Sequence, residues 1–126
     1  MTAITITDAG VNLIRDGLSG ANTSLIRYVA LGTSSVAPST SDTVLGAESY
    51  RKSVTSYVNG GSVGEVLISM YLGPADDIGD NIQEVGFFGG NAARATPNSG
   101  VLIARGLYVH TKTGLEGVTF TLDLTI

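Results

Sequence analysis

Hydrophobic and polar residues alternate over most of the chain, which is the pattern of β-strands that bury one face. The clearest alternation lies at residues 115–126, where we expect the inward-facing residues to be Val118, Phe120, Leu122, Leu124 and Ile126. The outward-facing residues of this strand are then Thr119, Thr121, Asp123 and Thr125. Phe120 and Leu122 are therefore predicted core residues.

Similar runs predict further strands at residues 25–31, 50–58, 63–72, 82–88 and 101–111. We expect the strand 101–111 to pair with the strand 115–126 and the chain to turn between them near residues 112–114. Asn59-Gly60-Gly61 predicts a hairpin turn, because Asn and Gly tolerate the positive φ of tight turns. Six or so strands spaced about ten residues apart indicate a mainly β fold, either an antiparallel β-sandwich or an open barrel.

One short helix is predicted near the start of the chain, at about residues 8–19. Thr7 or Asp8 is suited to cap it, and Gly20 is suited to the left-handed position that follows a helix. Its apolar face is expected to consist of Val11, Ile14 and Leu18, which are three and four residues apart. We expect this helix to lie on a sheet.

Two long loops are predicted at residues 33–43 and 89–100, where Ser, Thr, Pro and Asn occur without periodicity. Loops of this length in a compact domain are usually functional or mobile. Val44, Leu45 and Tyr50 are expected to attach the far end of the first loop to the core. In Gly86-Phe87-Phe88-Gly89-Gly90, the glycines are interpreted as bends that let both rings enter the core.

Length and composition favour one weakly charged domain. The 126 residues suit a single domain, 1–126, with a core of its own. Cysteine is absent, which excludes disulfides and thiolate chemistry. Charged residues make up only 14% of the chain, against about a quarter in typical proteins. Two interpretations of this low charge stay open: an ordinary, weakly charged β protein, or a protein whose surface is largely covered by neighbouring subunits.

Charge and hydropathy exclude several kinds of partner. The net charge is −4, and only Arg51 and Lys52 are adjacent among the basic residues, so no patch suited to nucleic acid is predicted. No apolar run approaches the length of a membrane span of about 18 residues. The start of the sequence lacks a basic region followed by an apolar stretch, so we expect no signal peptide and synthesis in a cytoplasm.

Three sets of residues are candidates for chemical sites. His110 is the single histidine, and no Gly-x-Ser-x-Gly turn accompanies it, so a hydrolytic triad is not predicted. A calcium site would draw on Asp76, Asp77 and Asp80, whose spacing does not match the twelve-residue calcium loop. A glycosidase pair would be drawn from Glu48, Glu65, Glu84 and Glu116. We expect no enzyme activity and no catalytic, cofactor-binding or metal-binding residue.

Two segments of the chain combine strands and glycine turns in a distinctive order. In the first, the strand that ends in Ala30-Leu31-Gly32 precedes Ala37-Pro38 and Ser41–Leu45, and the segment ends at Glu48 and Arg51. The second joins Glu84-Val85-Gly86-Phe87-Phe88, across a loop, to Leu102-Ile103-Ala104-Arg105. Together with the opening Thr7-Asp8-Ala9-Gly10, these segments resemble a tail-fibre and collar module of tailed phages, and the resemblance covers most of the chain.

The resemblance implies a virion structural protein, made in the host cytoplasm, that acts as a tail-fibre base or adaptor, a collar protein or a baseplate component. Its partners would be other virion proteins, and it implies a homo-oligomer, with a trimer favoured. In long fibres such a module precedes a shaft and a receptor-binding tip, whereas this sequence ends at Ile126, so we expect only the particle-attached end. Two alternatives remain open: a small carbohydrate-binding or glycan-hydrolysing β domain, and a capsid-attached head-fibre or decoration protein.

Overall fold

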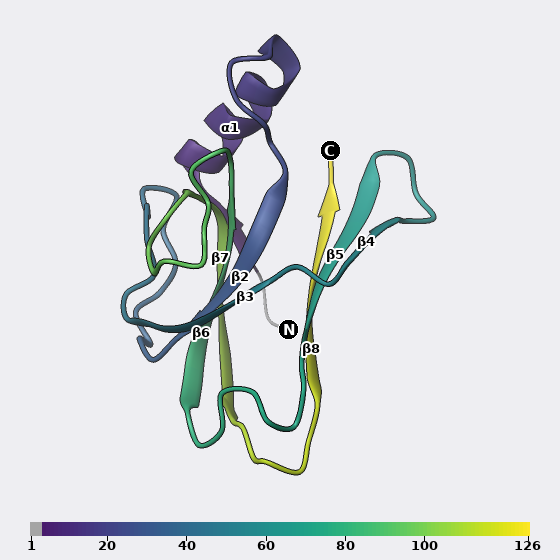
Figure 1. The fold of residues 1–126 in the computed structure, drawn as a ribbon. Coiled ribbons are helices and arrows are strands. Elements are labelled where there is room, and N and C mark those ends of the chain that lie inside the picture. Colours follow the sequence, from purple (N-terminus) through teal and green to yellow (C-terminus); the bar gives the residue numbers. More distant parts are fainter. Residues whose placement is uncertain (1–3) are drawn as a thin grey trace.

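Two antiparallel sheets and one helix make up the protein, for which a computed structural model describes residues 4–126 (Figure 1). The five-stranded sheet has the order β1-β7-β6-β2-β3, and the three-stranded sheet has the order β4-β5-β8. The sheets do not close into a barrel, so the predicted mainly β fold is confirmed as a β-sandwich with one short helix. The elements are β1 (Ile4–Ile6), α1 (Asp8–Ser19), β2 (Ile26–Gly32), β3 (Glu48–Ser53), β4 (Ser56–Asn59), β5 (Glu65–Leu72), β6 (Asn81–Gly89), β7 (Val101–Thr111) and β8 (Val118–Thr125).

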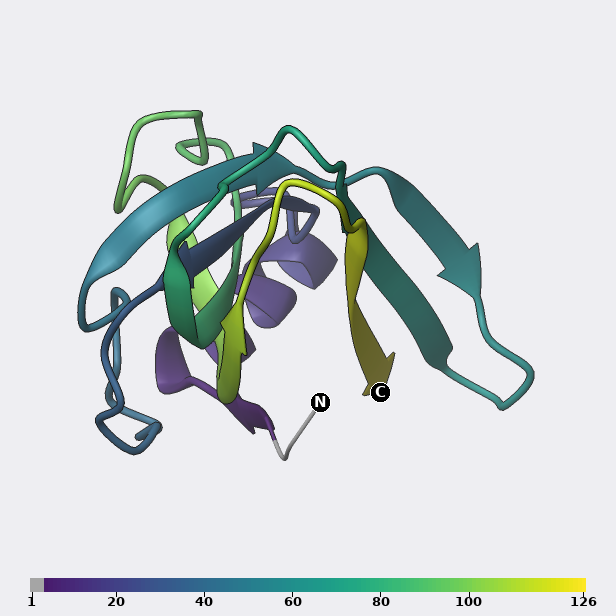
Figure 2. The same ribbon diagram turned by 90° about the horizontal axis from the view of Figure 1, so that it is seen from below.

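The predicted strand at residues 50–58 is in fact two strands in different sheets. The Val54 N–H donates to the Arg27 carbonyl at 2.9 Å in the five-stranded sheet, and the Thr55 N–H donates to the Ser69 carbonyl at 2.8 Å in the three-stranded sheet. The chain changes sheets between these residues, and the β4–β5 hairpin projects beyond the five-stranded sheet (Figure 2). Apolar alternation continues across the crossing, so the sequence pattern does not reveal it.

The predicted pairing of the last two strands is also wrong. β7 pairs with β1 and β6, whereas β8 pairs with β5 in the other sheet. Residues 112–117 therefore cross between the sheets and do not form a hairpin. The hairpin predicted at Asn59-Gly60-Gly61 does join β4 to β5, but its positive φ lies at Gly64, with a value of 74°.

The main core fills the space between the two sheets. Phe87 from β6, Met70 from β5 and Phe120 from β8 are each at most 3% exposed, and the Tyr108 ring meets the Phe120 ring edge-on at 5.4 Å. Along β8 the predicted alternation is confirmed, with Leu122 buried as well, except that Ile126 is 82% exposed. Burial of this apolar surface is the main source of stability of the sandwich.

The helix has the predicted bounds and caps, but it buries a different face. Leu13 and Gly10 are buried, whereas Val11 is 56% exposed and Leu18 is 88% exposed. A Cβ atom on Gly10 would lie 2.6 Å from the Ile103 carbonyl oxygen, so the missing side chain lets the helix backbone lie directly on β7. The orientation of the helix follows from this close approach and not from its most apolar stripe.

The two phenylalanines of β6 point to opposite faces of the five-stranded sheet. Phe87 lies in the main core, whereas Phe88 lies in a smaller apolar cluster on the outer face. Both rings are completely buried, as predicted, but β6 runs through this segment as one strand to Gly89. The irregularity lies in the pairing, where the register with β7 shifts between Phe87 and Phe88. Gly86 instead makes room for the Leu45 side chain, whose Cδ2 would lie 2.6 Å from an added Cβ.

Truncation of Phe120 tests the register of β8. Phe120→Ala is expected to reduce the free energy of unfolding by about 3–5 kcal/mol, because it removes a fully packed ring. Thr121→Ala removes a 2.9 Å hydrogen bond to the Ser69 hydroxyl on the opposite face and is expected to cost at most about 1.5 kcal/mol. Urea unfolding measures both values, and equal losses would mean that the register of β8 is wrong.

Candidate functional site

The outer face of the five-stranded sheet carries the two long loops of the chain. Residues 33–47 join β2 to β3, and residues 90–100 join β6 to β7; we call them loop 33–47 and loop 90–100. Both lie beside a small apolar cluster on this face, formed by Ala30, Leu45, Phe88 and Leu102 with Tyr28 at its margin. An arginine–glutamate pair from the sheet contacts each loop.

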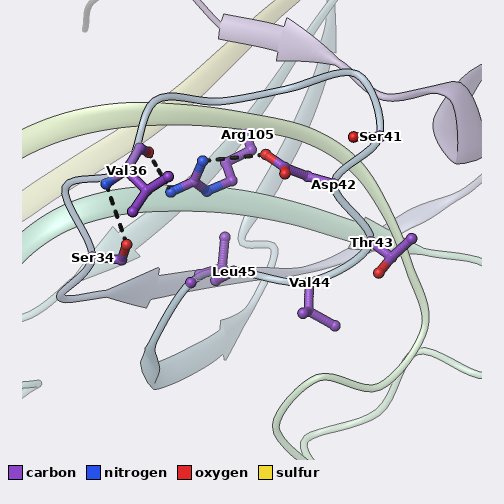
Figure 3. A pocket seen from close by; sticks show the side chains of 9 residues that line it. Ser34, Val36, Ser41, Asp42, Thr43, Val44, Leu45 and Arg105 are labelled. Atoms are coloured by element: carbon purple, nitrogen blue, oxygen red, sulfur yellow. Dashed lines mark hydrogen bonds and ion pairs between the residues drawn. The ribbon is translucent and has the colours of Figure 1, made fainter.

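Arg105 of β7 contacts both halves of loop 33–47. Its Nη1 donates to an Asp42 carboxylate oxygen at 3.2 Å, and its Nη2 donates to the Val36 carbonyl at 2.8 Å (Figure 3). Its Nε donates to Glu84 at 3.0 Å, and the Arg105 side chain is only 2% exposed. Hydrogen bonds to charged groups in such dry surroundings are stronger than those at the surface.

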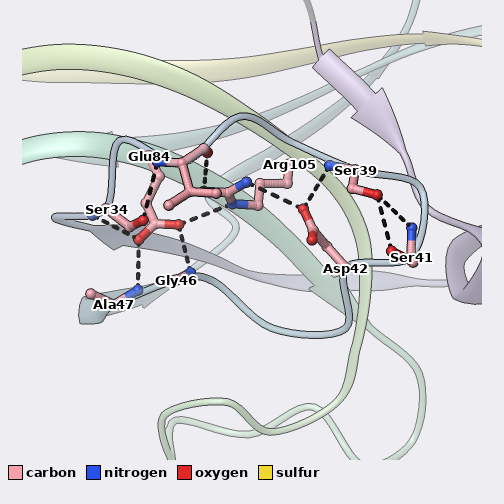
Figure 4. A network of polar contacts seen from close by, with 9 residues as sticks. Ser34, Ser39, Ser41, Asp42, Gly46, Ala47, Glu84 and Arg105 are labelled. Atoms are coloured by element: carbon pink, nitrogen blue, oxygen red, sulfur yellow. Dashed lines mark hydrogen bonds and ion pairs between the residues drawn. The ribbon is translucent and has the colours of Figure 1, made fainter.

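Glu84 of β6 is completely buried and binds the two ends of the same loop. Its carboxylate accepts the backbone N–H groups of Ser34 at 3.1 Å, Gly46 at 2.8 Å and Ala47 at 2.8 Å (Figure 4). A Cβ on Gly32 would collide with the Glu84 carboxylate, so glycine is required beside this charge. Glu84 thus accepts three hydrogen bonds from the loop and one from Arg105 on the neighbouring strand β7.

A second buried pair orders loop 90–100. Arg51 of β3 binds Glu48 through two nitrogen atoms, at 2.8 and 2.9 Å, and both side chains are 2% exposed. The remaining Arg51 nitrogen donates to the carbonyls of Arg94 and Ser99 at 3.0 and 2.9 Å. The guanidinium also lies 4.3 Å from the centre of the Phe88 ring, which adds a cation–π contact.

Loop 33–47 encloses an open hollow of about 470 Å³ next to Arg105 (Figure 3). Ser34, Ser41, Asp42 and Thr43 line it together with the apolar residues Val36, Val44 and Leu45. The lining is thus about half polar and half apolar, and the hollow is of a size that admits a small ligand. Arg105 and Asp42 lie at its wall but are already bound to each other.

The predicted chemical residues are separated in the fold. His110 Nε2 lies 2.9 Å from a Glu116 oxygen, and its ring lies 6.1 Å from Tyr108, with no hydroxyl nucleophile bound to it among residues 4–126. The pKa of Glu116 is lowered, first by the N–H of Thr113 and then by His110. This arrangement is a local contact in the β7–β8 crossing and provides no hydrolytic triad.

The three aspartates considered for calcium do not form a metal site. Asp76 binds Lys52 at 2.7 Å and the Gly73 N–H at 2.8 Å, and Asp80 accepts a bond from the Ser49 hydroxyl. Asp77 has a φ of 47°, and its Oδ2 is buried without a hydrogen-bond partner among the described residues. Within residues 4–126, no group of three or more possible ligands is arranged to hold a metal ion.

The four glutamates considered for glycoside hydrolysis each have a protein partner. Glu48 and Glu84 both oppose Gly32 across neighbouring strands, but each is buried against its own arginine. Glu116 binds His110, and Glu65 shares a hydrogen bond with Asp123 that lowers the pKa of Glu65 and raises that of Asp123. A glycosidase needs one carboxyl free to donate a proton and another free to act as base or nucleophile. These residues are not arranged in that way.

No protein family, curated protein or solved structure was found to match this chain. No helix of residues 4–126 is both long and apolar enough to cross a bilayer. The four residues of the buried pairs all lie in the two segments that carry the resemblance described above. The sequence signal for Glu84 and Arg105 is a charged residue inside an otherwise apolar run, because a buried charge requires a partner. Glu48 and Arg51 lie in the polar strand β3 and give no such signal.

Removing Arg105 is expected to destabilise the protein strongly. Arg105→Met leaves the Glu84 carboxylate buried without its cation, which typically costs about 3–5 kcal/mol of unfolding free energy. The double variant Glu84→Gln/Arg105→Met is expected to recover part of this loss. Urea unfolding measures both variants, and limited proteolysis should show cleavage in loop 33–47 of the single variant.

The matched control for Arg105 is Arg15→Ala, which breaks a surface pair with Asp16 in which the Arg15 side chain is 67% exposed. Exposed pairs contribute little, so its effect should stay below about 1 kcal/mol. If Arg105→Met cost no more than Arg15→Ala, the Glu84–Arg105 pair would not be the contact that orders the loop.

Asp77 is expected to make stability depend on pH. Burial, followed by the neighbouring Asp80, raises the pKa of Asp77 to about 6. The folded protein therefore binds this proton more tightly than the unfolded chain, whose pKa is about 3.9, and the free energy of unfolding falls as pH rises between these values. Asp77→Asn should be more stable than the parent above pH 6 and equal to it below about pH 4.

The control is Asp76→Asn, because the Lys52 contact lowers the pKa of Asp76. This carboxylate stabilises the fold when charged, so its variant should be less stable than the parent at neutral pH and equal to it in acid. Denaturant melts across this pH range test both signs. A fall in stability for Asp77→Asn at pH 8 would contradict the assignment.

Proposed function

We propose that this protein is a structural subunit of a phage particle: a tail-fibre base or adaptor, a collar protein or a baseplate component. It binds other virion subunits through protein–protein contacts and carries out no reaction. The proposal begins from the resemblance of the two segments that contain the Glu48–Arg51 and Glu84–Arg105 pairs. In this fold those segments build the face that presents both loops.

The placement of charge is the observation that carries the proposal. The chain has only seven basic and eleven acidic residues, and five of these are almost completely buried, the four of the two pairs and Lys112. The surface is therefore even poorer in charge than the composition suggests. A surface with few charged groups can be covered by a neighbour without removing many ions from water.

The order of the loops supports the same role. Loop 33–47 is fixed at Ser34, Val36, Asp42, Gly46 and Ala47 by only two side chains of the sheet. Its exposed residues, such as Val36 at 70%, are thus presented on a rigid support. Rigid loops lose little conformational entropy when a partner binds them, which favours affinity.

The hollow of loop 33–47 favours a second candidate, a domain that binds a small carbohydrate. The Ser, Thr and Asp residues of its lining can exchange hydrogen bonds with sugar hydroxyls, and its Val and Leu residues can contact the apolar faces of a sugar ring. A glycan array with the purified protein tests this candidate. Reproducible sugar binding that is lost in Asp42→Ala would favour it over the assembly role.

The assembly role is tested by mass spectrometry and imaging of intact particles. We expect the chain at a fixed copy number, a multiple of three or six as the resemblance implies. Val36→Asp should leave the thermal unfolding midpoint unchanged but reduce incorporation at least about tenfold, because a charge in the contact must be desolvated. The matched control is Val63→Asp in the β4–β5 turn, where Val63 is 97% exposed. Absence of the chain from purified particles would refute the proposal.

A further inference from the structure

The strand β8 has one edge without a partner among residues 4–126. β8 pairs with β5 over all eight of its residues without a register shift, and it is the last strand of the order β4-β5-β8. The N–H of Ile126 donates to the Gly64 carbonyl on the β5 side. Because backbone groups of an antiparallel strand alternate in direction, those of Thr119, Thr121, Asp123 and Thr125 face the free edge.

The pairing of β4 with β5 confirms this direction independently. The carbonyls of Glu65 and Ser69 accept bonds from the N–H groups of Gly60 and Thr55, on the β4 side. The alternate residues Val66 and Ile68 therefore turn their backbone groups toward β8. The free edge of β8 is thus a regular row of donors and acceptors at every second residue.

This edge lacks the features that usually keep strand edges apart. β8 contains no proline, lysine or bulge, and Asp123 is its single charged residue. The other sheet edges are less regular: β1 has three residues, β4 has four, and β3 carries Arg51 and Lys52 and pairs with a register shift. Long, flat and weakly charged edges readily pair with another chain.

A hollow of about 200 Å³ lies beside the middle of this edge. It is lined by Tyr108, Thr119, Phe120 and Thr121, and the Tyr108 ring borders the main core. A strand added to β8 would lie along this hollow and cover the side of the sandwich that β8 leaves open. The free edge and the hollow therefore point to an extended strand as the occupant.

We infer that β8 pairs antiparallel with β8 of a second copy of this chain, about a two-fold axis at Thr121. The inference rests on the proposed assembly role only in taking the protein to be built for contact with other subunits. The pairing joins the two three-stranded sheets into one six-stranded sheet. It also places the Thr-rich face of one β8 beside the Thr-rich face of the other. The apolar faces of the two strands likewise lie side by side.

The position of the charges selects this register. With Thr121 on the axis, Asp123 of each copy lies opposite Thr119 of the other, and the two Asp123 side chains are about four residues apart along the strands. An axis at Leu122 would place them diagonally at about 7–8 Å. Glu65 shares a hydrogen bond with Asp123, so each copy carries a pair of acidic side chains at this point. The Thr121 register keeps this pair away from the same pair of the other copy.

A second copy fits this edge better than a three-fold arrangement does. In a closed trimer, β8 of each copy would have to pair with a different edge of the next copy. The other edge strand of the same sheet, β4, has four residues against eight in β8, so half of the row would stay unpaired. Pairing of β8 with β8 joins two strands of equal length, eight residues each. The inferred dimer therefore differs from the trimer that the resemblance implies.

The test changes the charge at Thr119, which is exposed on β8. In the Thr121 register, Thr119→Lys creates two symmetric ion pairs with Asp123 of the other copy, and Thr119→Asp creates two repulsive pairs. Sedimentation equilibrium of the full chain should give a dimer whose dissociation constant falls several-fold in Thr119→Lys and rises at least tenfold in Thr119→Asp. Val58→Lys and Val58→Asp, on the outer face of β4, are the matched controls and should leave it unchanged.

Hydrogen exchange of the unaltered protein gives a second measurement that does not depend on a variant. The amides of Thr119, Thr121 and Asp123 should become protected as protein concentration rises. A monomer at every concentration, with unchanged hydrogen exchange, would overturn the inference. A dimer or trimer whose dissociation constant is unchanged in the Thr119 variants would overturn it as well. Tightening by Thr121→Lys would overturn the register and move the axis to Leu122. A β8 dimer that is absent from particles would instead refute the proposed function alone.

Discussion

The buried contact between Glu84 and Arg105 is the constraint on which the loop-bearing face depends. A carboxylate enclosed on a sheet needs a cation and several N–H donors, and loop 33–47 closes over Glu84 to supply the amides of Ser34, Gly46 and Ala47. The same requirement explains Gly32, since any side chain there would occupy the space of the carboxylate. The loop then reaches the helix, where the Asp8 N–H donates to the Thr40 carbonyl at 2.8 Å. One charge therefore connects the sheet, the loop and the start of α1.

The Glu48–Arg51 pair repeats this solution on β3, the edge strand of the same sheet, with the Phe88 ring under the guanidinium in place of a second carboxylate. Both pairs use charge inside the fold and leave the surface to hydroxyl groups, glycine and scattered apolar side chains. This division is consistent with the assembly role proposed above, in which the faces of the subunit are covered without desolvating many ions and specificity comes from backbone edges and the shape of rigid loops.

Periodicity predicts most strands, the helix bounds and the core residues Phe120 and Leu122, because burial on one face of a regular element leaves a local pattern. Three features escape this reasoning. The crossing at Val54 and Thr55 preserves alternation, and the exposed stripe of α1 follows from Gly10 lying on Ile103. The site is only half visible: Glu84 and Arg105 can be recognised as charges inside apolar runs, but their pairing with each other and with Asp42 depends on how distant segments meet.

The pairing of the first strand with the seventh has a consequence for the order of events during synthesis. The Thr7 hydroxyl, which caps α1, donates to the Leu102 carbonyl, 95 positions away, and β1 has no other strand partner among the described residues. Likewise, the edge of β5 that pairs with β8 stays unpaired until β8 has been made. Such distant contacts slow folding, because a long segment must be brought together before any of them forms. During translation, β1 and α1 therefore leave the ribosome well before β7, so they reach their final contacts only after most of the chain has been made.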